Sequence, residues 1–245
     1  MRICLLVLTS LVLLAGAAFA KTKTLYYGVA NETNLPFVEV DYSNGRAEVT
    51  GGILKKLADA LTNELNLKPG IILLPQKRVG PDLVSGELGI VCFVHQSWFP
   101  PELTNQLLWS DELTSNTNLI TTIKGKPVSK IEDLFGKQVG AIVNYYYKKM
   151  DPYFESGKIT KETGPSTASN IQKLLHGRME YMIISNLEYD FYKKKNPELR
   201  SYDLGLDTVK VKCALSKKAG IELGELNKAI AALKKNGTLD KIFKP

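Results

Sequence analysis

The chain is poor in the side chains that most metal and catalytic sites need. It has only 2 histidines and 3 cysteines among 245 residues, and these are scattered, so no spaced His and Cys set for a metal ion is present. There is also no glycine-rich phosphate loop, no nucleophile elbow and no hydrolase-like order of Ser, His and Asp. We therefore expect no metal, no cofactor and no enzymatic activity.

The sequence also lacks a dense basic stripe interleaved with aromatic residues. Its formal net charge is +7, but the lysines are spread along the chain. The strongest charge run, "YKKKNPELR" at 192–200, is typical of a solvated helix end. Nucleic acid is therefore not an expected partner.

A long apolar run occurs only at the start, in "MRICLLVLTSLVLLAGAAFA" (1–20). A positive Arg2, a short apolar core and an Ala-Phe-Ala ending predict a secretory signal peptide cleaved before Lys21, rather than a membrane helix. Cys4 lies too early to be a lipid-attachment cysteine. Cleavage lowers the formal net charge from +7 to +6, because Arg2 is the only charged residue removed. The expected product is a soluble, exported chain of about 225 residues, enough for one large or two small domains.

Two cysteines remain after this cleavage, Cys92 in "GIVCFV" and Cys213 in "VKVKCALS". An exported protein can form a disulfide between them. Free cysteine is, however, commonly a buried core residue, and both cysteines lie in apolar runs. We expect two buried free thiols.

Strand-like and helix-like segments alternate along the rest of the chain, which favours parallel sheets covered on both sides. The β-α-β pattern occurs twice, separated by an extended stretch near 113–123, and predicts two α/β lobes with the last strand and helix rejoining the first lobe. We expect lobe 1 at 21–118 plus 211–245, and lobe 2 at 119–210. A cleft between lobes is a favoured ligand site, and strand ends point toward it. The strands are expected at 24–30, 70–75, 88–94, 137–143, 159–164, 179–185 and 208–218, and the helices at 53–66, 80–87, from 145, at 169–178 and from 223.

The order of several motifs resembles the periplasmic solute-binding proteins of ABC importers, specifically the amino-acid-binding group called family 3. The resemblance covers about Leu25 to Phe243. It is carried by "LPFVEVDYSNGRAEVTGGILKKLADALTNELN", "LVSGELGIV", "WSDEL", "IEDLFGKQVGAIV", "LLHGRMEYMIIS" and "LNKAIAALKKNGTLDKIF". It implies a type II periplasmic-binding-protein fold of class α/β, in which each lobe is a mostly parallel sheet flanked by helices and two strand crossings join the lobes.

The chain differs from that family at the positions where family members bind the charged groups of an amino acid. The segment that carries a carboxylate-binding arginine in the family is "VHQSWFPPELTNQ" (94–106) here, without Arg or Lys. The position of the ammonium-binding carboxylate falls at Ser185, followed by Asn186. The Gly-Thr-Thr type turn falls at Asn144, Tyr145 and Tyr146.

The resemblance then implies a cleft with aromatic and neutral polar walls. We expect Trp98, Tyr145 and Tyr146 to stack on ligand, with Gln96, Ser185 and Asn186 as hydrogen-bonding partners. Such walls suit a ring, a sugar-like face, a cationic group or a peptide-like amide. The remaining candidates are Ser97 and Asn144 at the cleft, Phe37 as a stacking ring or a loop-packing residue, and Arg78 as a charge reader or a surface arginine.

The expected function is capture of a small polar organic solute, amino-acid-like or divergent, by a monomeric periplasmic protein that serves an ABC permease. The alternative is a ligand-sensing protein that presents its state to a sensor kinase or chemoreceptor. A dehydratase-like enzyme on the same fold would need a general acid or base, for which His95 and Glu180 are the candidates.

Overall fold

The structure of the protein is a computed structural model that describes residues 23–43, 45–143 and 145–244. The expected signal peptide, Cys4, the cleavage position before Lys21, and Asn144 lie outside the described residues.

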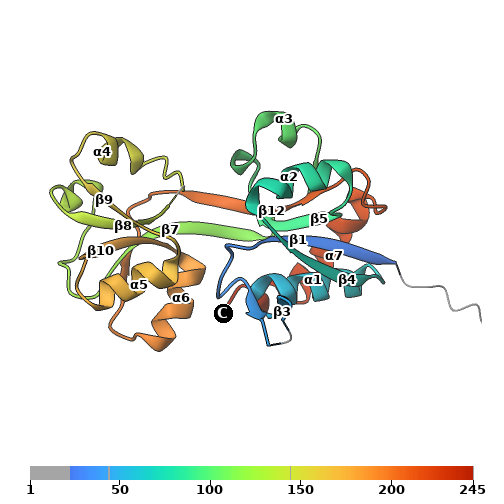
Figure 1. Cartoon of the computed structure of the whole chain (residues 1–245), viewed down its shortest axis with the longest axis horizontal. Coiled ribbons are helices and arrows are strands. Elements are labelled where there is room, and N and C mark those ends of the chain that lie inside the picture. The colour runs from blue at the N-terminus through green and yellow to red at the C-terminus, as the bar shows by residue number, and fades with distance from the viewer. Residues whose placement is uncertain (1–22, 44, 144, 245) are drawn as a thin grey trace, which may run out of the picture.

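Lobe 1 is built on the parallel strands β4-β1-β5, to which β12 and β6 add in the antiparallel direction (Figure 1). Its strands are β1 (Thr24–Ala30), β4 (Lys68–Leu74), β5 (Ile90–Val94), β6 (Leu108–Trp109) and β12 (Thr208–Leu215), with a separate hairpin of β2 (Glu39–Asp41) and β3 (Glu48–Gly51). Its helices are α1 (Ile53–Glu64), α2 (Gln76–Ser85), the 3₁₀ helix η1 (Gln96–Trp98), α3 (Pro101–Thr104), α7 (Leu223–Lys235) and α8 (Thr238–Ile242).

Lobe 2 repeats this plan with the parallel strands β10-β8-β9 and the antiparallel strands β7 and β11. The strands are β7 (Thr114–Thr122), β8 (Gln138–Ile142), β9 (Thr160–Gly164), β10 (Tyr181–Ser185) and β11 (Arg200–Tyr202). The helices are η2 (Ile131–Leu134), α4 (Asp151–Glu155), α5 (Thr167–Leu175) and α6 (Asn186–Lys195). None of the helices in the described ranges is long and apolar enough to cross a membrane.

Two long strands connect the lobes. β7 and β12 run antiparallel between them and pair with each other from Thr114 opposite Val211 to Thr117 opposite Thr208 (Figure 1). Beyond this stretch β7 pairs with β10 and β11 in lobe 2, while β12 pairs with β5 and β6 in lobe 1. The expected α/β class, two lobes, mostly parallel sheets and two strand crossings are therefore present.

Each lobe has its own apolar core. In lobe 1 the helix α1 buries Leu57 and Leu61, and α7 buries Leu226 and Ile230, against the same cluster. This spacing is that of an amphipathic helix, and it was readable in the sequence. Leu187 of α6, 3% exposed, also belongs to this cluster although its helix lies in lobe 2; the cluster includes Val209 and Val211 of the crossing strand β12.

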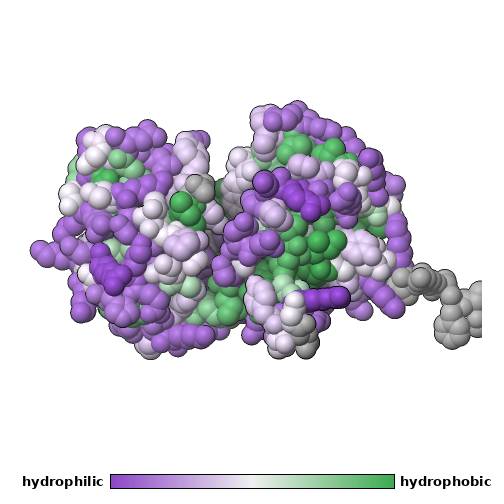
Figure 2. All heavy atoms as spheres, viewed as in Figure 1, coloured by the Kyte–Doolittle hydropathy of each residue, from purple (hydrophilic) through white to green (hydrophobic). Residues whose placement is uncertain are grey.

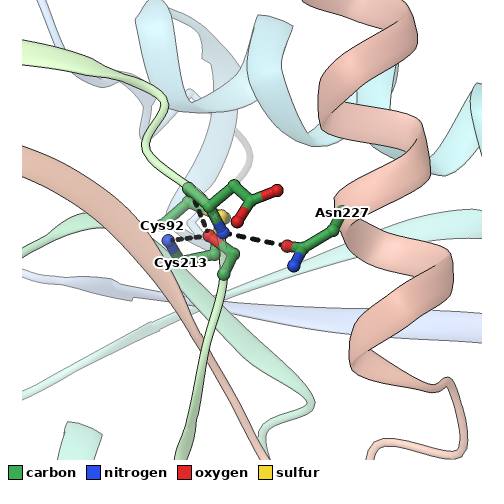
Figure 3. Close-up of a disulfide and its surroundings, with 5 residues drawn as sticks. Cys92, Cys213 and Asn227 are labelled. Atoms are coloured by element: carbon green, nitrogen blue, oxygen red, sulfur yellow. Dashed lines mark hydrogen bonds between the residues drawn. A yellow bond between two sulfur atoms is a disulfide. The ribbon is translucent and has the colours of Figure 1, made fainter.

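The expectation of two free thiols is wrong. Cys92 and Cys213 lie directly opposite each other on the antiparallel strands β5 and β12, with their Cα atoms 3.9 Å apart, and form a disulfide (Figure 3). Around it, the Cys213 N–H donates to Ser110 Oγ (2.8 Å) and the Asp111 N–H donates to Asn227 Oδ1 (2.9 Å) on α7. The sequence could not distinguish the two states, because a buried thiol and a buried disulfide are both surrounded by apolar residues. Whether two sulfur atoms meet depends on which strands become neighbours.

Two local expectations also fail. The stretch between β1 and α1, expected as a loop, contains the β2–β3 hairpin. The helix α5 begins earlier than expected, because Ser166 is its N-cap and accepts a hydrogen bond from the Ser169 N–H (3.2 Å). Asn170, which lies at the start of the expected helix, is fully buried within α5 and donates to the Ala141 carbonyl (2.9 Å).

Candidate ligand-binding cleft

The carboxyl ends of the parallel strands in lobe 2 face lobe 1. β10 is antiparallel to β7, with Ser185 opposite Asn118 and Met182 opposite Thr121. Since β7 enters lobe 2 from lobe 1, Asn118 is nearer to lobe 1 than Thr121 is. The end of β10, and with it the ends of β8 and β9, is therefore directed at lobe 1.

The same argument applies to lobe 1 in reverse. β5 is antiparallel to β12, with Val94 opposite Lys212 and Ile90 opposite Leu215. Because β12 comes from lobe 2, the carboxyl end of β5 is directed at lobe 2. Figure 2 shows the surface hollowed between the two lobes. Ligands of open α/β sheets bind outside the carboxyl ends of the strands, so this hollow is the candidate site.

The tyrosine segment after β8 forms part of the lobe 2 wall, and its three rings differ sharply in exposure. Tyr147 is 4% exposed, whereas Tyr145 is 63% and Tyr146 76% exposed. The Tyr147 hydroxyl accepts a hydrogen bond from the Ile142 N–H (3.0 Å), which fixes it beneath the strand end. Tyr145 and Tyr146, the two rings expected to stack on ligand, are therefore the exposed members of the segment.

The expected helix starting at Tyr145 is wrong. The helix α4 begins at Asp151, where the Asp-Pro pair supplies a favourable first turn. Asp151 is 7% exposed, accepts from the Tyr147 N–H (2.8 Å) and forms an ion pair with Lys161 (2.9 Å). The acidic side chain therefore anchors the tyrosine segment to lobe 2 as an irregular loop.

Carboxylates from both lobes influence Tyr145. Its side chain is 63% exposed, and its pKa is raised above the ordinary value mainly because protein replaces part of the water around it, and then by the charges of Glu188 and Glu32. Glu188 belongs to lobe 2, and Glu32 follows β1 in lobe 1, so both lobes contribute charge at this ring.

Ser185 is used to begin α6. It is 6% exposed, is the N-cap of the helix and accepts from the Glu188 N–H (3.3 Å), while its hydroxyl donates to Glu188 Oε2 (2.7 Å). The other carboxylate oxygen of Glu188, Oε1, accepts from the Thr167 hydroxyl (2.6 Å) at the start of α5. Glu188 thus joins the ends of β9 and β10.

Glu188 was missing from the residues expected at the site. The signal that would have identified it is the Ser-x-x-Glu pattern of a capping box directly after a strand. Asn186, which was expected, lies next to it, and its Oδ1 accepts from the Thr117 N–H (2.9 Å). This hydrogen bond ties α6 to the crossing strand β7.

On the opposite wall, Gln96, Ser97 and Trp98 form η1 directly after β5, and all three are exposed. His95 caps this turn: its Nδ1 accepts from the Ser97 N–H (3.2 Å) and lies 2.8 Å from Ser97 Oγ. Trp98 is 49% exposed, and its ring centre lies 6.2 Å from that of His95. The indole is therefore held on a short turn at a strand end that faces lobe 2.

Phe37 and Arg78 are occupied within lobe 1. The Phe37 ring is partly buried against the lobe 1 core, with its centre 4.8 Å from that of Phe93. Arg78, whose side chain is 54% exposed, forms ion pairs with Asp82 (2.8 Å) and Glu87 (3.4 Å). These contacts are those of the alternatives named above, in which Phe37 packs a loop onto lobe 1 and Arg78 is a surface arginine.

Two further hollows, of about 230 and 250 Å³, lie outside this cleft. One is lined by residues of β3, α1 and β4, and the other by α5 together with Arg178. Neither includes a segment that follows a strand into the cleft. An open cleft between two lobes is wide rather than enclosed, so the site is defined here by strand direction and side-chain position.

Comparison with protein-family models finds no match, and comparison with curated proteins finds no relative. Solved structures, in contrast, are similar over most of their length. An ancestral arginine-binding protein bound to arginine has a TM-score of 0.66 and 24% identity, covering 90% of this chain and 96% of that one.

Two other solved structures are similar to the same extent. The ancestral cationic amino acid solute-binding protein AncCDT-1, described elsewhere as a precursor of cyclohexadienyl dehydratase, has a TM-score of 0.73 and 23% identity, with 90% and 93% coverage. The L-cystine solute receptor of Neisseria gonorrhoeae, in its unliganded open conformation, has a TM-score of 0.66 and 18% identity, with 91% of both chains covered. The chain has the two-lobed fold of the type II periplasmic binding proteins.

Proposed function

We propose that this chain is a periplasmic substrate-binding protein that captures a small polar organic solute between its lobes for an ABC importer. The observation that carries the proposal is the direction of the two sheets, whose carboxyl ends face each other across the hollow of Figure 2. Trp98 follows β5 in lobe 1, and Tyr145 follows β8 in lobe 2. Ligand contacts from both lobes would favour the closed state, which a partner recognises.

Two further features support this function. The disulfide between Cys92 and Cys213 is of the kind that persists in oxidising compartments, and so agrees with the expected cleaved signal peptide and periplasmic location. The similar solved structures are described as amino-acid-binding proteins and solute receptors. We assign residues 21–118 and 211–245 to lobe 1 and 119–210 to lobe 2, and we expect a monomer.

An enzymatic role has less support. The candidate acid or base Glu180 precedes β10, at the end away from the cleft, and pairs with Lys137 (3.2 Å). His95 follows the carboxyl end of β5, where its Nδ1 already accepts a hydrogen bond from the Ser97 N–H. The two groups are therefore not assembled. Since AncCDT-1 is described as a dehydratase precursor, turnover of any bound compound, lost in His95→Ala, would revive this role.

The experiment that tests the proposal is the melting temperature of residues 21–245 against amino acids, dipeptides, sugars, polyamines and aromatic acids. A ligand at a hundred times its Kd stabilises the folded state by about 2.7 kcal/mol, which raises Tm by a few degrees. At least one compound is expected to do so, and Trp98→Ala is expected to remove the shift. A panel without any shift would count against solute capture. Purification of the protein with a sensor ectodomain, rather than with a permease, would favour the sensing alternative.

A further inference from the structure

The cleft contains a carboxylate without a cationic partner. Glu188 is partly buried and accepts hydrogen bonds from the Thr167 hydroxyl on Oε1 (2.6 Å) and, on Oε2, from the Ser185 hydroxyl (2.7 Å) and the Ser185 N–H (3.4 Å). Among the described residues no Lys, Arg or His forms an ion pair with it. Since these donors are neutral, the negative charge of Glu188 remains available to the hollow between the lobes.

Glu188 also stands where a ligand carboxylate would otherwise find donors. Helix N-termini attract anions through their free N–H groups and the helix dipole. Here the N-terminus of α5 is capped by Ser166 and that of α6 by Ser185, and Glu188 bonds residues at both. The protein's own carboxylate therefore occupies the place of an anion between these two helices.

The segments that directly follow the parallel strands carry little positive charge. Five of the six parallel strands, all but β4, are followed by five residues without Lys or Arg. After β4 come Lys77 and Arg78, and the arginine is paired with Asp82 and Glu87. On the lobe 1 side Glu32 lies two residues after the carboxyl end of β1, which is parallel to β5 and is therefore also directed at lobe 2. Its side chain is exposed and has no ion pair among the described residues.

We infer that the ligand is an organic cation without a carboxylate group, held between Glu188 of lobe 2 and Glu32 of lobe 1 with its charge against the faces of Tyr145 and Trp98. This inference rests on the proposed function and names the class of solute. Aromatic faces attract cations, and more strongly where water is excluded by closure. An α-amino acid would bring its own carboxylate next to Glu188 without a paired donor, and burial of an unpaired charge is unfavourable.

Matched pairs of compounds that differ only in the carboxylate test this inference. We would measure by calorimetry the affinity of residues 21–245 for agmatine against arginine and for cadaverine against lysine. Agmatine or cadaverine is expected to bind at least tenfold more tightly than its parent amino acid. Tighter binding of arginine or lysine, or of a neutral solute alone, would overturn the inference and leave solute capture intact. No binding of any compound in either panel would overturn both.

Variants that neutralise one carboxylate at a time test which side chains bind the cation. Glu188→Gln keeps the size of the side chain and the capping pattern, since Gln also serves at this position of a capping box. It is expected to weaken binding of the preferred cation by about tenfold or more, with Glu32→Gln giving a smaller loss because that side chain is exposed. The matched controls, Glu198→Gln in lobe 2 and Glu64→Gln in lobe 1, lie at exposed positions outside the cleft segments and are expected to bind like the parent. Unchanged affinity in Glu188→Gln, with an unchanged Tm, would overturn the inference.

Discussion

At the scale of single residues, the three consecutive tyrosines show how one motif serves two purposes. Tyr147 is fixed in lobe 2 by its hydroxyl, its N–H and the Lys161 ammonium, which lies 5.6 Å from its ring centre. Tyr145 and Tyr146 stay exposed at the cleft edge because of this anchor. Tyr147 therefore holds the loop in place, whereas the two rings proposed to contact ligand are its exposed neighbours.

The change Tyr147→Phe is expected to lower the stability of the unliganded protein. It removes the acceptor of the Ile142 N–H, and an unsatisfied buried donor costs about 1–3 kcal/mol. A chain of this size then loses roughly 2–4 °C of Tm per kcal/mol. Calorimetric or fluorescence melting would measure the loss. Tyr146→Phe is the control, since its ring is 76% exposed, and an equal loss there would contradict the assigned role of the Tyr147 hydroxyl.

The change Trp98→Ala is expected to weaken ligand binding by more than tenfold and to leave Tm of the unliganded protein nearly unchanged. The indole is 49% exposed and stands on a turn that faces lobe 2, so its removal affects the cleft more than the core. Titration with the ligand found in the panel would measure this. Tyr42→Ala, at another exposed aromatic in lobe 1 (68%), provides the comparison. Parent-like affinity in Trp98→Ala would mean that the lobe 1 wall is formed by other residues.

At the scale of helices and strands, pairing partners decide what local patterns leave open. The amphipathic spacing of α1 and α7 predicts their buried faces correctly, because that spacing is a property of the helix itself. The β2–β3 hairpin and the start of α4 were not predicted. The hairpin strands are three and four residues long, too short for a clear alternation, and α4 depends on the Asp151 side chain binding the tyrosine segment.

The disulfide between β5 and β12 is expected to stabilise lobe 1 substantially. It joins residues separated by 121 positions, and removal of a native disulfide typically costs about 2–5 kcal/mol. Thiol titration of residues 21–245 in denaturant should find no free thiol before reduction and two after it. Cys92→Ala/Cys213→Ala should melt several degrees lower. Two free thiols in the unreduced protein would show that Cys92 and Cys213 are not bonded, as the sequence analysis expected.

At the scale of the whole molecule, two lobes joined by β7 and β12 place residues from distant parts of the chain around one hollow. Leu187 packs into the lobe 1 cluster, and the next residue, Glu188, acts on the same tyrosine ring as Glu32 from lobe 1. The hydrogen bond from the Thr117 N–H to Asn186 fixes α6 to the crossing strand β7 and so keeps Glu188 near the hinge.

The folded protein is expected to lose stability at alkaline pH. The pKa values of Tyr27, Tyr145, Tyr147, Tyr181 and Tyr192 are all raised, chiefly by loss of solvent. Each of these tyrosines contributes to the stability of the folded protein while it is neutral. That contribution is complete below the unfolded pKa of 10.0 and is lost progressively as pH rises from this value through the higher pKa of the folded state. Tm measured from pH 8 to 11 should fall at the upper end.

Phenolate absorbance provides the independent check on these tyrosines. In the native protein part of the tyrosine absorbance should titrate at higher pH than in the same chain in denaturant. Coincident titration curves would show that the pKa values of these five tyrosines are not raised in the folded protein.

The sequence alone determined the alternation of strands and helices, the buried faces of α1 and α7, and the two-lobed α/β fold with its cleft between strand ends. These features depend on local periodicity and on the order of elements, which are present in the sequence itself. Only the tertiary structure decided that Cys92 meets Cys213, and that Glu188, which was not in the expected set, bonds both Thr167 and Ser185. Such choices depend on which strands become neighbours and which donors surround a side chain, and residues far apart in the chain settle both.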